Sequence, residues 1–171
     1  MDNSIQKTEI RQSFYALPPS AQRIREMKTL LADLCLWSLL GSHQTIQKIE
    51  KTENGYRILT DSYSLDIEVL YKQDGCRIGP AEFEFVFSEP ETFSQPFPGQ
   101  GQELTAGQTL RELQALLADP YLYEILGSVQ LIERIEKTKN GYFLQTNRNS
   151  VTVRVIDVQG DSDLPQFDFF S

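Results

Sequence analysis

The sequence has 171 residues, 40% of them hydrophobic and 11% aromatic, and carries a formal net charge of −8 at pH 7. No apolar run approaches the roughly 18 residues of a membrane-spanning helix, and the negative charge disfavours direct contact with nucleic acid phosphates. We therefore expect a soluble globular protein that binds neither membranes nor nucleic acids. Residues 1–7 have neither the basic start nor the apolar centre of a secretory signal, so the cytoplasm is the expected compartment.

The chain starts with a segment of weak periodicity, residues 1–19, that ends in two prolines. We expect an arm or a short helix that the prolines stop. From Ala21 the spacing of apolar residues predicts a helix that Gly41 ends in a left-handed cap. One stripe of this helix holds Ile24, Met27, Leu30, Leu31 and Leu34.

Four strands are predicted after this helix. The dipeptide Asn54-Gly55 predicts a hairpin with a type I′ turn, because both central residues of that turn need positive φ. Apolar residues then alternate with polar ones in two further segments, as they do in strands with one buried face. The four predicted strands cover residues 46–53, 56–61, 65–71 and 82–87.

The same order of elements recurs later in the chain. The stretch from Ile49 to Tyr56 reappears almost letter for letter from Ile135 to Tyr142, 86 residues later. The predicted fold class is therefore α+β, a tandem duplication of a helix followed by a four-stranded antiparallel meander, with the two modules related by a pseudo-twofold. The predicted divisions are an arm at 1–19, a first module at 20–88, a linker at 89–103 and a second module at 104–171.

One difference between the second helix and the first is informative: Pro120 stands where the first helix has Leu34. A proline inside a helix costs roughly 3 kcal/mol, so this helix should bend or restart at Pro120, with Asp119 as its N-cap. Asp33 at the matching position suggests a bend in the first helix too. The second helix is expected to begin in a capping box formed by Thr105 and Gln108. The two helices share one charged pair, which either reaches the sheet rim or linker or stays solvated beside the apolar stripe. This pair is Arg25-Glu26 in the first helix and Arg111-Glu112 in the second.

One face of each predicted meander is buried under its own helix, and the other has mixed character. Its apolar residues predict contact between the modules or with a partner, and the repeat favours contact between equivalent surfaces, as in a homodimer joined by a linker. We therefore expect a monomer that is an intramolecular pseudo-dimer. The apolar residues of this face are Leu59, Leu70, Val86, Phe143, Ile156 and Phe170.

Acidic residues gather near the end of each module, where no lysine or arginine follows Arg77 until Arg111, and none follows Arg154. They either protect edge strands and solubility or form a surface for a protein partner, for which a basic partner surface is one option. Two aromatic residues in the Pro-rich linker anchor a partner or pack back onto the sheets. The candidate partner-binding residues are Glu82, Glu84, Glu89, Glu91, Phe93, Phe97, Asp161, Asp163 and Asp168.

Residue types that carry catalysis are scarce. His43 stands alone in the loop after the first helix and is interpreted as an ordinary loop residue. Cys35 is expected to be a small buried thiol within the helix, and Cys76 lies in a predicted turn; both are interpreted as free, with a single bridge between them as the alternative. No catalytic, cofactor or metal site is predicted, because these residues have no ligand spacing.

The leading functional hypothesis is a non-enzymatic protein-interaction module, such as an assembly factor, adaptor or inhibitor, that uses an acidic two-module surface. The alternative is a binder of a small apolar ligand between helix and sheet, lined by Tyr56 or Phe85, because a helix cupped by a meander broadly resembles the cystatin and NTF2-like architecture. That resemblance is one of architecture and includes no shared motif. An enzyme is the third possibility, and it needs Glu82 and Glu84 to converge in a cleft.

Overall fold

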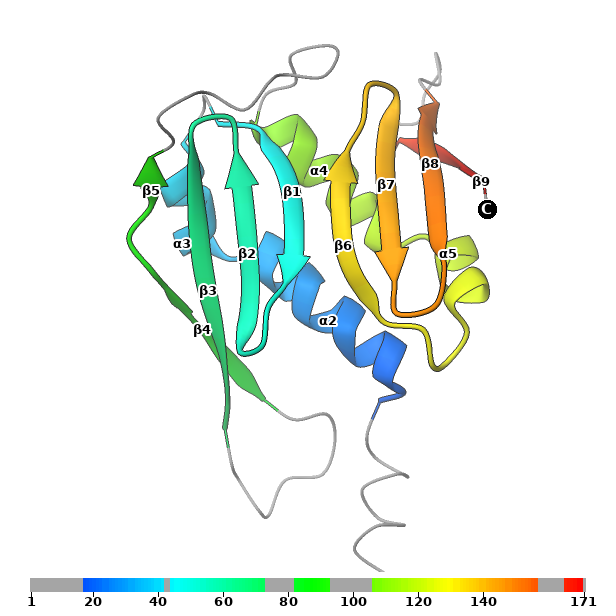
Figure 1. The fold of residues 1–171 in the computed structure, drawn as a ribbon, viewed down its shortest axis with the longest axis horizontal. Coiled ribbons are helices and arrows are strands. Elements are labelled where there is room, and N and C mark those ends of the chain that lie inside the picture. Colours follow the sequence, from blue (N-terminus) through cyan, green and yellow to red (C-terminus); the bar gives the residue numbers. More distant parts are fainter. Residues whose placement is uncertain (1–16, 42–43, 73–81, 93–105, 157–164, 171) are drawn as a thin grey trace, which may run out of the picture.

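The structure is a computed structural model that describes residues 17–41, 44–72, 82–92, 106–156 and 165–170. In these residues the protein is α+β, with four helices and one antiparallel sheet of nine strands (Figure 1). The helices are α2 (Pro19–Leu31), α3 (Leu34–Leu40), α4 (Ala106–Leu117) and α5 (Pro120–Leu126). The strands are β1 (Ile46–Lys51), β2 (Gly55–Thr60), β3 (Tyr63–Tyr71), β4 (Phe83–Phe87), β5 (Glu91–Thr92), β6 (Ile132–Lys137), β7 (Gly141–Thr146), β8 (Ser150–Ile156) and β9 (Gln166–Phe170).

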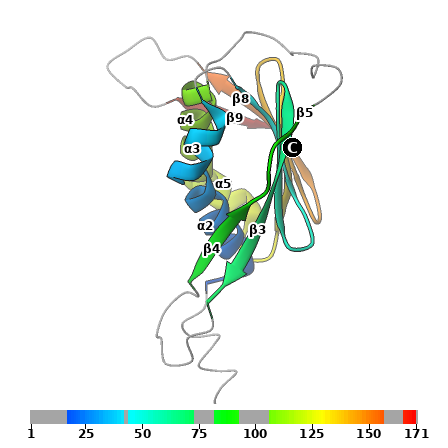
Figure 2. The ribbon, with the colours of Figure 1, turned by 90° about the vertical axis from the view of Figure 1, so that its left-hand side faces the viewer.

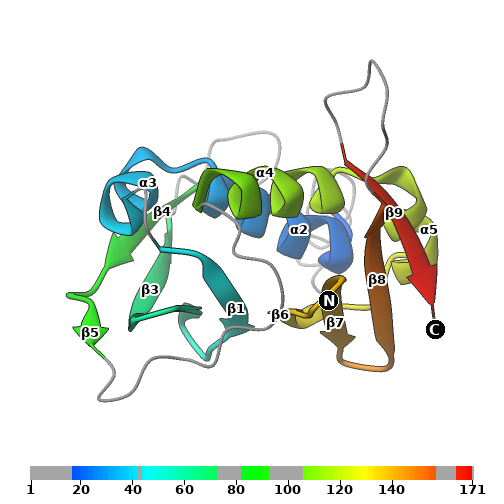
Figure 3. The same cartoon turned by 90° about the horizontal axis from the view of Figure 1, so that it is seen from above.

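The helices lie together on one face of the sheet (Figure 2). Seen from above, the two ends of the sheet, β4 and β9, rise toward the helix layer, so the sheet curves around the helices (Figure 3). One cluster of buried side chains from both halves of the chain fills the space between the layers. Among the described helices, none combines the length and the apolar character that a membrane crossing requires.

Both helical segments are interrupted at the predicted positions. The Asp119 side chain accepts a hydrogen bond from the backbone N–H of Tyr121 at 2.8 Å, and α5 restarts at Pro120. Asp33 makes the same contact with the N–H of Cys35, also at 2.8 Å, so the bend expected from Asp33 is confirmed. The aspartates satisfy N–H groups that have no partner within a new helix.

The restart of α3 corrects two expectations about buried residues. Leu34 does not continue the apolar stripe of α2, because its side chain is 82% exposed. Cys35 is a free thiol, as expected, but it is exposed rather than buried. The break at Asp33 sets a new helical phase, in which Leu36 and Leu40 face the core instead. The predicted continuous stripe was therefore wrong from Leu34 onward.

The helix ends and the hairpins use glycine in different ways. Gly41 has φ 63° and ψ −163°, so the expected positive φ is confirmed, although the extended ψ differs from a left-handed helical cap. Gly41 and Gly127 are the glycines with positive φ in the described chain, so Gly55 does not form the predicted type I′ turn. A Cβ on Gly55 would instead overlap the carbonyl oxygen of Ile67 and lie 2.9 Å from the Cα of Glu68.

The strands follow the order β4-β3-β2-β1-β6-β7-β8-β9, with β5 paired to β3. The two halves of the chain meet at the antiparallel pair β1–β6, which we call the central seam. Ile49 stands opposite Ile135 there, flanked by the pairs Lys48–Glu136 and Glu50–Arg134. The halves therefore join through strand edges, and the predicted contact between the mixed sheet faces is wrong. The faces do not meet because both belong to one continuous sheet.

The helix layer also bridges the two halves. The hydroxyl of Ser20 donates to the carbonyl of Gly127 at 2.7 Å, and Nε2 of Gln114 donates to the carbonyl of Leu31 at 3.0 Å. The start of the predicted linker is strand β5, in which Glu91 stands opposite Ser64. The expected capping box at Thr105 lies outside the described residues.

The last strands of the two halves differ in spacing. Phe85 stands opposite Val69 in the first half, and Phe167 stands opposite Val155 in the second. The two valines are 86 residues apart, whereas the two phenylalanines are 82 apart, so the connection to β9 is shorter than the connection to β4. The sequence repeat is in register up to β8 and shifts by four residues at β9.

Candidate functional site

Two carboxylate–tyrosine pairs, one buried and one partly buried, connect the helices to the sheet. The Tyr56 hydroxyl donates to Oε1 of Glu26 at 2.8 Å, and the Tyr142 hydroxyl donates to Oε1 of Glu112 at 2.7 Å. Glu26 is only 6% exposed. Of the two open interpretations of the Arg-Glu helix pairs, the structure therefore supports glutamates that reach the sheet. A sequence signal for this contact exists, because the glutamate and the tyrosine of each pair are separated by the same 30 residues in both halves.

The environment of both tyrosines favours the neutral phenol. Burial raises the pKa of Tyr56 far above its ordinary value, and the negative charge and the hydrogen bond of Glu26 raise it further. Burial and Glu112 raise the pKa of Tyr142 in the same way. Neither hydroxyl can therefore act as a base near neutral pH. Tyr56 is also only 1% exposed within the core, which gives no support to an apolar ligand site lined by its ring.

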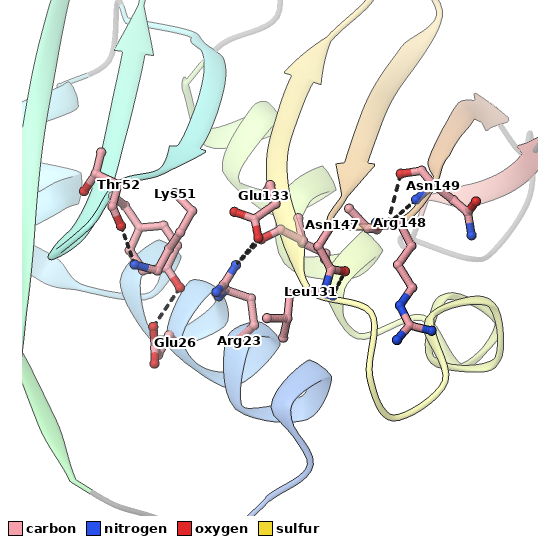
Figure 4. A network of polar contacts seen from close by, with 12 residues as sticks. Arg23, Glu26, Lys51, Thr52, Leu131, Glu133, Asn147, Arg148 and Asn149 are labelled. Carbon is pink, nitrogen blue, oxygen red and sulfur yellow. Dashed lines mark hydrogen bonds and ion pairs between the residues drawn. The ribbon is translucent and has the colours of Figure 1, made fainter.

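A second group of charged residues, which includes Arg23, Lys51 and Glu133, lies at one end of the central seam (Figure 4). Arg23 donates from Nη1 to the carbonyl of Ile132 at 2.5 Å, and the same nitrogen lies 3.8 Å from Oε1 of Glu133. Arg23 comes from α2 and the other two residues from the β6 region, so these contacts join the halves. At the matching positions of the other half stand Thr109 and Gln47, so this ion pair has no charged counterpart there.

Lys51 completes this group. Its Nζ donates to the carbonyl of Thr52 at 2.5 Å and lies 5.4 Å from the centroid of the Tyr56 ring. Burial and the nearby charge of Arg23 lower the pKa of Lys51, while Glu26 and Glu133 oppose that shift. Two cations and two carboxylates thus compensate one another. The contacts of Arg23 and Glu26 position α2 against the sheet.

Removing the Tyr56 hydroxyl tests this positioning role. We expect Tyr56→Phe to lower the free energy of unfolding by about 1–3 kcal/mol at neutral pH, because Glu26 then remains buried without its donor. Since the folded-state pKa of Tyr56 is raised, its stabilisation is complete below about pH 10 and declines as the pH rises above it. Urea denaturation at about pH 8 and about pH 11 measures both effects. A wild-type loss of stability on alkalinisation that Tyr56→Phe does not reduce would contradict the assignment.

The sheet face away from the helices, which we call the outer face, carries paired surface charges. Nε of Arg57 lies 2.7 Å from Oδ1 of Asp66, and Nη2 of Arg154 lies 2.8 Å from Oδ2 of Asp168. Such exposed pairs contribute about 0–1 kcal/mol each. The outer face includes residues whose side chains alternate with core residues, among them Lys48, Glu50, Arg57, Leu59, Asp66, Glu68, Leu70, Glu84, Val86, Arg134, Glu136, Phe143, Thr152, Arg154, Ile156, Gln166, Asp168 and Phe170.

The two halves of the outer face differ in chemistry. In the first half Leu70 and Val86 are 39% and 47% exposed, and no ion pair is formed by Glu68 or Glu84 within the described chain. In the second half Arg154 lies 5.3 Å from the ring centroid of Phe170, which is 48% exposed. The first half is therefore acidic and aliphatic, and the second combines arginine with aromatic rings.

The predicted partner-binding residues do not form one site. Glu84 lies on β4, at one end of the sheet, whereas Asp168 lies on β9 at the other end (Figure 1). Glu89 and Glu91 are exposed next to β4, and the backbone carbonyl of Glu82 accepts from Lys72 N at 2.8 Å. The other predicted partner-binding residues lie outside the described residues: Phe93, Phe97, Asp161 and Asp163. His43 and Cys76, two further candidates from the sequence, lie outside them too.

The positions of these acids do not support a catalytic cleft. Glu84 is exposed on the outer face of an end strand. Within the described ranges no three histidine, cysteine, aspartate or glutamate side chains are grouped so that they could bind a metal ion. Comparisons with protein-family models, with curated proteins and with solved structures gave no match to this chain.

Proposed function

We propose that this chain is a non-enzymatic protein-interaction module, for example an assembly factor, an adaptor or an inhibitor, and that the outer face of its sheet contacts the partner. The observation that carries this proposal is that the described helices all cover the opposite face (Figure 2). Apolar side chains that remain exposed among charged ones are typical of protein interfaces. On this face they include Leu70, Val86 and Phe170.

The proposal includes an internal duplication of two modules related by a pseudo-twofold. Its support is the register of the central seam, where Ile49 stands opposite Ile135, its counterpart in the sequence repeat. The Glu26–Tyr56 and Glu112–Tyr142 pairs are also counterparts, with bonds of 2.8 Å and 2.7 Å. Two similar units in one sheet give a wide surface whose halves have diverged in charge and aromatic content.

The use of the polar groups between α2 and the sheet supports a non-enzymatic role. Glu26 and Arg23 of α2 make contacts with the sheet, and Lys51 of β1 donates to the carbonyl of Thr52. On the surface, Glu68 and Glu84 in the first half of the outer face are exposed and form no ion pair within the described residues. A partner with a basic surface complements that half.

The test is affinity capture from a lysate of the source organism, with the full chain as bait and two charge-reversal variants. Glu68→Lys changes the outer face, whereas Glu124→Lys makes the same change on the exposed surface of α5. We expect Glu68→Lys to reduce recovery of the captured protein about threefold or more, because a favourable charge pair becomes repulsive. Glu124→Lys should leave recovery unchanged. Absence of a reproducible partner, or equal effects of the two variants, would refute the proposed function.

A further inference from the structure

Strand β4 ends the sheet on one side, and its backbone phase can be derived from two hydrogen bonds. Lys72 N donates to the carbonyl of Glu82 at 2.8 Å, and Ser88 N donates to the carbonyl of Asp66 at 2.9 Å. In an antiparallel pair, residues that exchange hydrogen bonds alternate with residues that do not. Three residues of β4 therefore direct their N–H and C=O groups away from β3, and these residues are Phe83, Phe85 and Phe87.

The side chains along this strand differ between its two sides. The rings of Phe83, Phe85 and Phe87 face the helix layer and are only partly buried. Successive side chains of a strand point to opposite faces, so Glu84 and Val86 lie on the outer face, where both are exposed. The free edge thus has an apolar side toward the helices and an acidic side toward the solvent. Glu89 and Glu91, also exposed, extend the acidic side toward β5.

The opposite end of the sheet is different. The carboxylate of Asp168 on β9 is already paired with Arg154 at 2.8 Å. The ring of Phe169 is covered in part by Tyr121, with centroids 5.3 Å apart. The rings of β4 are partly covered as well, since Arg25 lies 4.9 Å from the ring centroid of Phe83. The two edges therefore differ mainly in charge, because Glu84 forms no ion pair within the described residues whereas Asp168 does. This contrast makes the two edges a matched pair for experiment.

We propose that the β4 edge binds an extended basic peptide segment of the partner by strand addition; this inference rests on the proposed protein-interaction function. Free N–H and C=O groups of an edge strand are a template for another strand, and the side chains select the sequence. A strand placed beside Phe85 brings every second side chain next to the phenylalanine rings and the others next to Glu84. The edge thus selects alternating apolar and basic residues. Like charges at Glu84 and Glu91 disfavour a second copy of the same edge.

The direct experiment is hydrogen exchange of the full chain with a short synthetic peptide of alternating valine and lysine. In the free protein we expect rapid exchange of the amides of Phe83, Phe85 and Phe87, because they have no partner in the described sheet. The peptide should slow exchange of these amides and leave those of Phe167 and Phe169 unchanged. Peptides of alternating valine and glutamate, or with all valines before all lysines, are the controls.

A pair of charge variants tests the role of the carboxylate. Glu84→Lys should weaken binding of the valine–lysine peptide about three- to tenfold, since a cross-strand attraction becomes a repulsion. Gln166→Lys is the matched control, because Gln166 faces Ile156 on β9 as Glu84 faces Leu70 on β4, and it should leave the affinity unchanged. Both positions are exposed, so thermal unfolding should show that both variants fold.

Three results would overturn strand addition at β4: no peptide-dependent protection, equal protection at β9, or equal affinity of Glu84→Lys and the wild type. Loss of binding by Glu84→Lys together with protection confined to β4 supports it. Results that refute strand addition at β4 can be distinguished from results that refute the proposed function. A partner that is captured through the outer face, yet remains bound to Glu84→Lys, refutes this inference alone. A chain that captures no partner refutes the function on which it rests.

Discussion

Replacing Ile49 with alanine is expected to lower the free energy of unfolding by about 2–5 kcal/mol, because the truncation leaves a cavity in the middle of the central seam. Ile49 stands opposite Ile135, and each side chain is only 1% exposed. Urea denaturation measures the change. The seam carries this large effect because the two halves of the core meet there, under helices that also bridge both halves.

A double-mutant cycle shows whether the two isoleucines stabilise the protein as a unit. Ile49→Ala and Ile135→Ala together should deviate from additivity by about 0.5–3 kcal/mol, since the two residues are direct neighbours. Ile67→Ala is the control, because Ile67 is equally buried but lies on β3, three strands from β6. Its effect should add to that of Ile135→Ala within about 0.5 kcal/mol. Additivity in both cycles would contradict a coupled seam.

Gly55→Ala is expected to destabilise the protein by about 1–3 kcal/mol, because the new Cβ collides with the backbone of β3 at Ile67 and the strands must move apart. Gly107→Ala is the matched control, since the same methyl group on Gly107 in α4 meets no atom within 4 Å. That change should stabilise the helix by about 0.5–1 kcal/mol. The two alanine variants should therefore have opposite signs in thermal or urea unfolding.

Asparagine at position 55 separates the two explanations for this glycine. A type I′ turn needs positive φ, which asparagine tolerates better than alanine does. A close backbone approach excludes any Cβ, so Gly55→Asn should destabilise at least as much as Gly55→Ala. If Gly55→Asn is clearly the more stable of the two, the collision with Ile67 is not the reason for glycine here.

The local features of this fold could be predicted from neighbouring residues. The N-caps at Asp33 and Asp119 and the alternation in the strands depend on atoms that are close in sequence, so their signals are written in short segments. Where a prediction depended on the phase of a helix, it failed after the break. Leu34 fits the stripe of α2 by spacing, yet its side chain is exposed because α3 starts a new helix there.

For the candidate sites, too, the sequence indicated local features but not the contacts between distant segments. The sequence indicated the acidic residues of the first half, but it could not show that Glu84 lies at the free edge, nor that Asp168 is paired with Arg154. It also left open whether Glu26 is solvated, because Tyr56 approaches it only when β2 packs under α2. A residue's availability for a partner depends on which distant side chains reach it first.

By itself the sequence determined the α+β class, the helices and strands other than β5, and the two breaks in the helices, since these arise from capping, periodicity and alternation over a few residues. Only the tertiary structure decided that the strands join into one sheet through Ile49 and Ile135. It likewise decided why Gly55 is glycine, because the atoms that exclude a side chain belong to β3. Both depend on strand pairing between segments far apart in the chain, for which no short stretch of sequence carries a signal.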